Sequence, residues 1–462
     1  MQSSSSWDGI AMPGRLWAIL AVMFAVSLSV LDGVIVNIAL PTICDGLQIT
    51  PSRSIWIINS YQIAIVISLL PFSALGDLVG YRRVYFFGLA LFTIMSGGCA
   101  ASWSLESLVA CRVLQGFGAS AIMSVNTSIV RLIFPRKMLG RALGLNSTVV
   151  SVSAVGGPTL AALILSFAEW PWLFAVNLPV GCVALMLGYL FLPDNPERSG
   201  GGRAEFRWGD AALNAITFGS VFALVTGYSQ GFDWWWLVLF GFIAAFVGRY
   251  YVGQQLRREN PILPFDLLRI PIFSLSVATS ILTFVAQMSM IVSLPFILQR
   301  QFGYSPVEVG AILTAWPAMN MCTTPISGFL VERYHAGILG CIGLATLCAG
   351  LLLLAFVPVD ATKIDFMWRL ALCGFGFGFF QAPNNSLIIS SAPLSRSGSA
   401  SGMMATARLT GQIAGAASVA LLFYIVPEES ANSILFVGVL FAGLAAILSF
   451  SRLSLPIPTN GA

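Results

Sequence analysis

Residues 26–41 read VSLSVLDGVIVNIALP, and they place a carboxylate inside the first long apolar run of the chain. A charged group at membrane depth is costly unless it has a partner, water or a proton, and such groups are functional by default. Among the 19 Asp and Glu residues, Asp32 is the one that we place deep in an apolar run, which makes it the only buried acid we expect. The stretch therefore predicts a membrane-spanning helix with a functional acid in it.

The composition extends this interpretation to the whole chain. Of its 462 residues, 57% are hydrophobic and 9% are charged, whereas a soluble domain carries roughly 25% charged residues. The basic residues lie mostly at the ends of apolar runs or between them, which argues against a nucleic-acid surface. The eight cysteines form no CxxC motif, so we interpret them as small hydrophobic residues.

Apolar runs of about 20 residues can each cross a bilayer as a helix. They must be helical, because every backbone polar group in lipid needs an internal partner. We count fourteen runs, which begin near Leu16, Ser54, Val84, Ser107, Arg141, Trp172, Asp210, Trp235, Ile272, Val307, Ile338, Phe366, Ser399 and Asn432. The predicted fold class is an all-α polytopic membrane protein with 14 transmembrane helices.

The basic residues orient these spans. With the N-terminus inside, 17 basic residues, Arg452 among them, fall on inner segments. Only four fall on outer segments, namely Arg53, Arg300, Lys363 and Arg369. Cytoplasmic loops carry an excess of Lys and Arg. We therefore expect a multi-pass protein of the inner (cytoplasmic) membrane, with both termini in the cytoplasm.

An internal repeat predicts two halves. SALGDLVGYRR (73–83) follows the second run and GFLVERYHAG (328–337) follows the tenth, and their shared pattern aligns Asp77 with Glu332. An offset of eight spans fits two six-helix halves with two helices inserted between them, and duplicated halves are typical of transporters. The alternative is a pair of ordinary charged turns. We expect an N-terminal half at 1–192, a cytoplasmic linker at 193–208, two inserted helices at 209–253 and a C-terminal half at 254–462.

Four segments resemble the major facilitator superfamily, in particular its fourteen-span drug:proton antiporters of the EmrB/QacA type. LDGVIVNIALP resembles the signature of the first span. SALGDLVGYRR resembles the loop motif G-x-L-x-D-R-x-G-R-K/R-K/R and departs from it at Ser73, Leu78 and Tyr81. RVLQGFGAS (112–120) resembles the fourth-span motif, and SAVGGPTLAA (153–162) resembles the fifth-span antiporter motif G-x-x-x-G-P-x-x-G-G with other small residues at some glycines. The resemblance covers nearly the whole chain.

The resemblance implies a set of gating residues. In the family, the loop cluster bridges the halves in one conformation, and the fifth-span motif is associated with export. On the basis of this resemblance and of the internal repeat, the expected gating residues are Asp77, Arg82, Arg83, Gly157, Pro158 and Glu332. The alternatives are arginines that only satisfy the topology rule and a proline that only bends its helix.

Arg112 is a second charge at membrane depth. It lies roughly 9 Å below the outer end of its run, and Asp32 lies roughly 12 Å below the outer end of its own. We therefore expect the two side chains to face each other across a water-accessible cavity. A change in their separation or hydration would make Asp32 take up or release a proton, as proton-coupled exchange requires. The alternative is a permanent structural ion pair.

Polar and aromatic residues within the apolar runs predict the wall of a substrate cavity. Along the fourth run, Arg112, Gln115, Ala119, Met123 and Asn126 recur at helical spacing and share one face. The cavity candidates are Tyr61, Gln115, Met123, Asn126, Gln287, Trp316, Asn320, Gln381, Asn384, Asn385 and Arg408. Ordinary helix packing is the alternative for each of them.

These observations favour a proton-coupled secondary exporter of small amphipathic compounds, that is, a multidrug or toxic-compound exporter. A major facilitator importer or exporter of one specific metabolite is the alternative. An enzyme is not expected, because the chain has one histidine, His335, and no HExxH, paired-cysteine or GxxxxGK[ST] motif. The duplication and the buried charges disfavour a passive channel. We expect no cofactor, the proton gradient as the energy source, and a monomer that binds a small-molecule substrate, protons and lipid but no nucleic acid.

Overall fold

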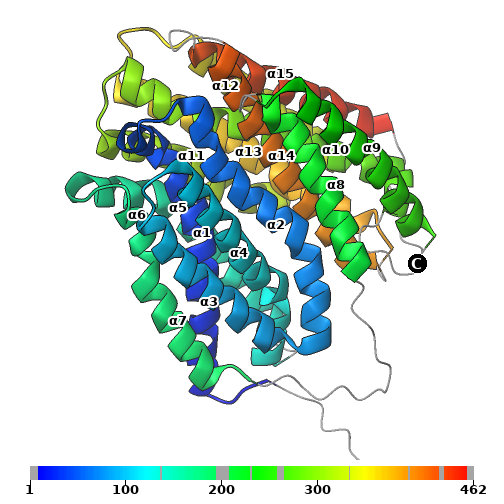
Figure 1. The fold of residues 1–462 in the computed structure, drawn as a ribbon. Coiled ribbons are helices and arrows are strands. Elements are labelled where there is room, and N and C mark those ends of the chain that lie inside the picture. The colour runs from blue at the N-terminus through cyan, green and yellow to red at the C-terminus, as the bar shows by residue number, and fades with distance from the viewer. Residues whose placement is uncertain are drawn as a thin grey trace, which may run out of the picture.

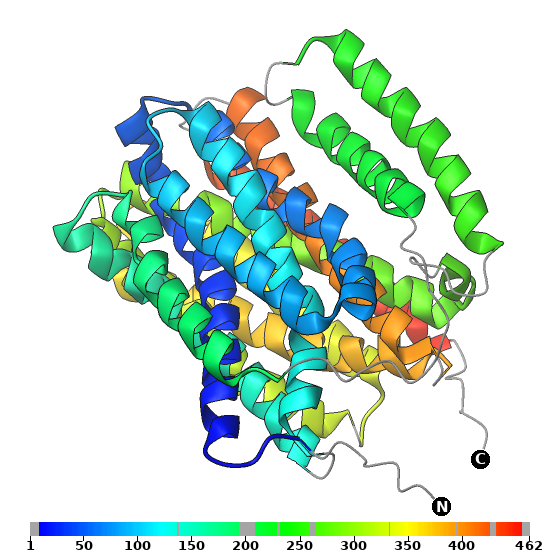
Figure 2. The same cartoon turned by 60° about the horizontal axis from the view of Figure 1, so that its bottom comes forward.

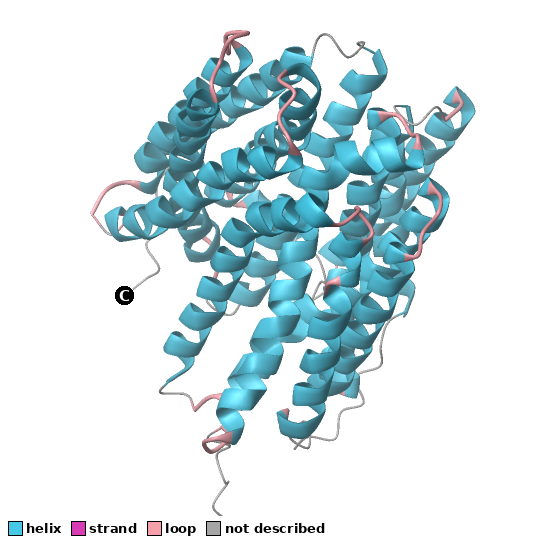
Figure 3. Ribbon diagram, turned by 90° about the vertical axis from the view of Figure 1, so that its left-hand side faces the viewer, coloured by secondary structure: helices cyan, strands magenta, loops and turns pink. Residues whose placement is uncertain are grey.

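The computed structural model describes residues 9–135, 138–193, 208–228, 232–257, 265–331, 333–393, 396–425 and 431–454. Regular structure in these ranges is helical throughout (Figure 3). The α-helices are α1 (Gly14–Leu47), α2 (Pro51–Val79), α3 (Tyr81–Ala100), α4 (Leu105–Ile133), α5 (Leu139–Phe167), α6 (Trp172–Ala175), α7 (Asn177–Phe191), α8 (Trp208–Gly227), α9 (Trp234–Leu256), α10 (Pro271–Phe296), α11 (Pro306–Leu330), α12 (Ala336–Ala355), α13 (Lys363–Ser390), α14 (Ser397–Ile425) and α15 (Ala431–Ser451). Helix α10 is flanked by two short helical turns, η3 (Phe265–Arg269) and η4 (Ile297–Gln301). A third short turn, η7 (Arg452–Ser454), follows α15.

Local sequence sets where several helices begin. Ser104 caps α4 by accepting a hydrogen bond from the backbone N–H of Ser107 at 3.2 Å, and Ser305 caps α11 in the same way with Glu308. Such caps satisfy backbone donors that the first helical turn leaves unpaired. The turns between apolar runs are therefore specified by nearby residues.

Each predicted apolar run coincides with a helix, and the sixth run is divided into α6 and α7. Twelve helices of the described residues are long and apolar enough to cross a membrane. The helices α11 and α13 are 25 and 28 residues long but are not among these twelve. Both carry internal prolines and polar side chains such as Asn320 and Asn384, which lower their apolar character. A count of fourteen spans therefore stays a prediction.

The helices form two groups that lie against each other (Figure 1). The helices α1–α7 contact one another, α10–α15 do the same, and the groups meet through α2 with α14, α5 with α11 and α1 with α10. The helices α8 and α9 pair at the edge of the bundle, where α8 packs on α2 and α14 (Figure 2). Residues 194–207 of the predicted linker lie outside the described residues.

Close helix contacts repeat between the two groups. Gly116 of α4 contacts the backbone carbonyl of Tyr61 in α2, and Gly374 of α13 contacts that of Trp316 in α11. A Cβ at either glycine would collide with that carbonyl, so only glycine permits the approach. Tyr61 and Trp316 are 255 residues apart, the same offset that separates Asp77 from Glu332 in the sequence. The glycines Gly116 and Gly374 are 258 residues apart, which is three more, so the contact repeats between the groups with nearly the same offset as the loop motif.

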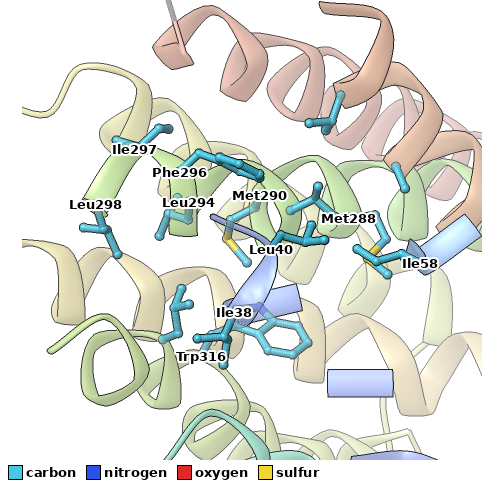
Figure 4. Packing of buried hydrophobic residues seen from close by; sticks show 14 of the residues in the cluster. Ile38, Leu40, Ile58, Met288, Met290, Leu294, Phe296, Ile297, Leu298 and Trp316 are labelled. Carbon is cyan, nitrogen blue, oxygen red and sulfur yellow. The ribbon is translucent and has the colours of Figure 1, made fainter. Parts of the chain in front are cut away.

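We name the two sides of the bundle after α1, which begins on the near side and ends on the far side. On the far side, one apolar cluster contains residues from both groups (Figure 4). Met288 and Met290 of α10 lie there with Ile38 and Leu40 of α1. Because apolar side chains from both groups are buried together, the bundle is closed on this side.

Polar contacts reinforce the closure. Ser52 Oγ at the start of α2 donates a hydrogen bond to the carbonyl of Ala420 in α14 at 3.0 Å. Arg300 in η4 lies 3.7 Å from the carboxylate of Asp45 in α1. Both contacts join the two groups on the far side.

Candidate functional site

Asp32 lies in the middle of α1 and is 2% exposed. Its Oδ2 atom accepts a hydrogen bond from Nη1 of Arg112 in α4, which makes a direct ion pair. Its Oδ1 atom accepts hydrogen bonds from Nε2 of Gln115 and Nδ2 of Asn177, each at 3.0 Å. One cation and two amide donors therefore surround the carboxylate.

Arg112 is 1% exposed, and other groups in the same site bind its guanidinium. Its Nε atom donates to the carbonyl of Ile57 at 3.2 Å, and Nη1 also donates to Oε1 of Gln115 at 2.7 Å. The guanidinium carbon lies 4.1 Å from the centre of the Tyr61 ring, within cation–π range. A buried ion pair is stable only when its remaining hydrogen-bonding groups are satisfied, and these contacts meet that condition.

Ser96 of α3 extends the arrangement. Gln115 Nε2 donates to Ser96 Oγ at 2.8 Å, and Ser96 Oγ donates to the carbonyl of Phe92 at 2.8 Å. The side chains thus connect α1, α2, α3, α4 and α7 in one buried site. We call this set the Asp32 network; its members are Asp32, Tyr61, Ser96, Arg112, Gln115 and Asn177.

The structure corrects the predicted geometry of the pair. Asp32 and Arg112 are in direct contact in a buried site, and no water-accessible cavity separates them. Tyr61 and Gln115 were predicted to line a cavity, but both are buried in the Asp32 network. Asp32 and Arg112 lie at the same depth in the bundle, as the residue counts predict. The rotation of α1 about its axis, which these counts do not determine, points Asp32 into its own half.

Gly33 marks open space close to the network. As the next residue in α1, it is turned by about 100° from Asp32. A Cβ on Gly33 would meet no atom of the described residues within 4 Å. Its neighbour Val34 contacts Gly157 of α5. The side of α1 that carries Gly33 therefore borders open space, which the Asp32 carboxylate does not face in this conformation.

The predicted face of α4 divides into two parts. Arg112, Gln115 and Ala119 are buried, whereas Met123 and Asn126, closer to the near side, are partly exposed. Asn126 Nδ2 donates a hydrogen bond to Oδ1 of Asn146 in α5 at 3.3 Å. Only the near-side part of this face is thus available to line a cavity.

Asn384 was predicted to line a cavity, but it binds a buried arginine. Its Oδ1 atom accepts a hydrogen bond from Nη1 of Arg452 at 2.7 Å. Arg452, which we expected on an inner segment, is 0% exposed and also donates to Ser276 at 3.0 Å and Ser449 at 2.6 Å. No acid of the described residues pairs with it. The topology rule already accounts for a basic residue at this position, so the burial of Arg452 could not be predicted from the pattern of charges.

The other candidates of the second half lie at varied positions. Gln287 and Trp316 are buried, and Gln287 Oε1 and Trp316 Nε1 have no hydrogen-bond partner among the described residues. Asn320 Oδ1 accepts from Thr324 within its own helix at 2.9 Å. The remaining candidates, Gln381, Asn385 and Arg408, are partly exposed.

The predicted gating residues also lie at separate places in the structure. Arg82 donates a hydrogen bond to the carbonyl of Tyr189 in α7 at 3.0 Å, which is a contact within its own half. Pro158 lies inside α5, and its carbonyl contacts Gly310 of α11 across the two groups. Arg83 is exposed. Asp77 ends α2 with its side chain undescribed, and Glu332 lies outside the described residues.

Asp210 is a second buried acid that the sequence did not reveal. It lies in the first turn of α8, where helix N-termini favour negative charge, and not in mid-span as Asp32 does. The expectation of a single buried acid was therefore wrong. No group of three or more His, Cys, Asp or Glu residues in the described ranges could hold a metal ion.

Comparisons with known proteins agree with this fold. The Major Facilitator Superfamily pattern matches residues 22–416. The chain is 48% identical over 449 residues to the uncharacterized transporter YebQ of Escherichia coli K12, covering 97% of this chain and 98% of that protein. It is 30% identical to the multidrug resistance protein Stp of Mycobacterium tuberculosis, covering 87% and 74%. It is 28% identical to the riboflavin transporter RibZ of Clostridioides difficile, covering 85% of each chain.

Two solved structures share the fold at low sequence identity. A D-xylose–proton symporter superposes with a TM-score of 0.70 at 13% identity, covering 97% of this chain and 99% of its own. A bacterial homologue of the lysosomal transporter Spinster, in an inward-facing unoccupied conformation, gives 0.69 at 15% identity, covering 96% and 97%. These likenesses show that the chain shares the fold of both structures.

Proposed function

The chain belongs to the major facilitator superfamily, and from this premise we propose that it is a proton-coupled exporter of small amphipathic compounds that works by alternating access. We also propose that α11 and α13 cross the membrane, which gives the fourteen spans of drug:proton antiporters. The excess of basic residues on the near side supports a cytoplasmic near side. With that orientation, the closed far side faces outward and the conformation faces the cytoplasm.

The observation that carries this proposal is the Asp32 network. With Arg112 in contact and two amides donating, the charged carboxylate is stabilised. A movement of α1 relative to α4 that separates Asp32 from Arg112 would leave a buried carboxylate without its cation, and that carboxylate would take up a proton. Protonation is thereby coupled to conformation, which is what exchange against protons requires.

The contacts between the halves suit a reversible closure. On the far side, the halves meet through apolar side chains, through an exposed ion pair and through Thr159 and Thr314, whose hydroxyl oxygens lie 3.1 Å apart. The ion pair is weak alone, because exposed ion pairs contribute about 0–1 kcal/mol. Rigid-body rocking of the halves can therefore open this side and close the other.

The experiment uses everted membrane vesicles that contain the full-length protein. Addition of an exported compound from a panel of dyes and antibiotics should dissipate the internal acidity of energised vesicles. Asp32→Asn retains the shape of the side chain but removes its titration, so we expect no substrate-induced proton flux at equal expression. Asp233→Asn, at an exposed position before α9, is the matched control and should behave as the wild type. Unchanged flux with Asp32→Asn would refute the coupling.

Transport of one specific metabolite is the second candidate. The observation that favours it is the 28% identity to a protein named as a riboflavin transporter. The same vesicles separate the two candidates, because a dedicated transporter should respond to riboflavin or another single compound and not to chemically unrelated drugs. A passive channel or an enzyme would give no uphill transport.

A further inference from the structure

Helix α14 contacts helices of both halves. Gly411 and Gly415 contact α10 of the second half, and Gly402 lies beside α2 of the first half. By the helical spacing, Arg408 and Gln412 project between these two contacts. The adjacent residue Ala407 is turned by about 100° from Arg408 and belongs to an apolar cluster with Tyr251 of α9. The side of α14 that carries Arg408 therefore lies between α10 and α2.

The exposure of residues on this side changes along α14. Ser401, nearest the near side, is exposed, whereas Ala405, Arg408 and Gln412 are partly exposed. Val419 on the far side is completely buried. This side of α14 is therefore exposed from the near side as far as Arg408 and Gln412 and is buried beyond them. This gradient agrees with the apolar closure on the far side.

The charge of Arg408 has no counterpart in the described residues. No hydrogen bond or ion pair joins it to another described side chain, and its Nε atom is buried without a partner. Asp32, the only acid in the middle of a described span, is already paired with Arg112. An unpaired cation at this depth is costly and is retained when it has a use.

Arg452 provides an internal contrast. It also lacks a carboxylate, but Asn384, Ser276 and Ser449 bind it away from solvent. Arg408 has no such shell and remains partly exposed on the accessible side of α14. A guanidinium presents several N–H donors in a planar fork that matches a carboxylate. Gln412, one turn farther along the same side, adds an amide.

We propose that Arg408 binds a carboxylate of the transported compound, so that the protein carries organic anions in preference to organic cations. The proposal rests on the proposed function as a transporter and specifies the substrate class of its central site. Gln412 is placed to donate a second hydrogen bond to the same group. Asp32, the acid in the middle of a described span, is paired with Arg112 and is therefore not free to attract a cation.

The test uses the purified full-length protein and two matched probes, a carboxylated fluorescent dye and its uncharged methyl ester. In proteoliposomes with an imposed proton gradient, the wild type should transport the acid faster than the ester. Arg408→Gln should lower transport of the acid by about tenfold or more, since tenfold corresponds to losing one interaction of ordinary strength, and should leave the ester unchanged. Arg408→Lys should retain part of the difference. Arg53→Gln, an exposed arginine on the far side, is the control.

A binding measurement accompanies transport. The acid should raise the Tm of the detergent-solubilised wild type, and the ester should not, because only a ligand that binds the folded state stabilises it. Equal stabilisation by both probes, or none by the acid, would overturn the anion proposal. A loss of transport for both probes in Arg408→Gln with an unchanged Tm would also overturn it and leave the transport function standing. Failure of the wild type to couple any compound of the wider panel to protons would instead contradict the proposed function.

Discussion

The two halves of the molecule repeat one architecture but hold their charges in opposite ways. In the first half, Asp32 and Arg112 neutralise each other within a buried hydrogen-bonded network. The residue of the second half that stands 255 positions after Asp32 is Gln287, which is uncharged. The described spans of that half have no acid away from their ends, yet α14 contains Arg408 and the buried Arg452 directly follows α15. The scaffold is duplicated, whereas the charges are divided between the halves.

This difference suggests a division of tasks. A paired acid can gain or lose a proton when its partner moves, so the first half suits proton coupling. An arginine without a carboxylate can accept one from a ligand, so the second half suits substrate recognition. Substitutions in the two halves should accordingly differ in both size and kind of effect.

The largest expected effect comes from breaking the pair in the first half. Arg112→Ala leaves Asp32 buried without its cation and should destabilise the protein by about 3–5 kcal/mol. The measurement is the thermal unfolding midpoint in one detergent at one pH. The double variant Asp32→Leu with Arg112→Met removes both charges and should recover much of the stability but no proton coupling. Equal destabilisation by the single and double variants would argue against the ion pair as the origin of the cost.

A smaller effect is expected in the second half. Arg452→Met removes a cation that has no carboxylate partner, so no buried charge remains behind. The main loss is the donor to Asn384 Oδ1, and an unsatisfied buried acceptor costs about 1–3 kcal/mol. The Tm should therefore fall less than in Arg112→Ala under identical conditions. A larger fall for Arg452→Met would reverse the contrast between the halves.

The smallest effect on stability is expected where the halves meet on the far side. The Asp45 side chain is 76% exposed, and its ion pair with Arg300 should contribute less than about 1 kcal/mol. Asp45→Asn should leave the Tm nearly unchanged but favour opening of the far side. Alkylation of a cysteine introduced at Ile38 in that variant reports the opening, since the residue is buried in the far-side cluster. Labelling no faster than in the same cysteine variant with Asp45 intact would exclude a role for the pair in closure.

Sequence reasoning located the helices because lipid permits little else for long apolar runs. It also brought Asp32 and Arg112 to one height, since residue counts from helix ends translate directly into depth. It could not give the rotation of α1, which turns Asp32 into its own half and not toward a cavity.

The rest of the network depends on three-dimensional packing. Asn177 and Ser96 are single polar residues in apolar runs, and only the assembled bundle shows that both approach Asp32 and Gln115. Arg452 stands at the end of a run, where an exposed arginine is the ordinary expectation. Its burial requires Asn384 and two serines from three other places in the chain.

Proton release from the purified protein tests the central claim most directly. A transported compound is added to detergent-solubilised protein in weakly buffered solution, and the change in pH is recorded together with binding. We predict that the wild type exchanges protons with solvent when it binds the compound, whereas Asp32→Asn binds it with no proton exchange. Equal proton exchange in the two proteins would contradict the claim that Asp32 is the coupling residue.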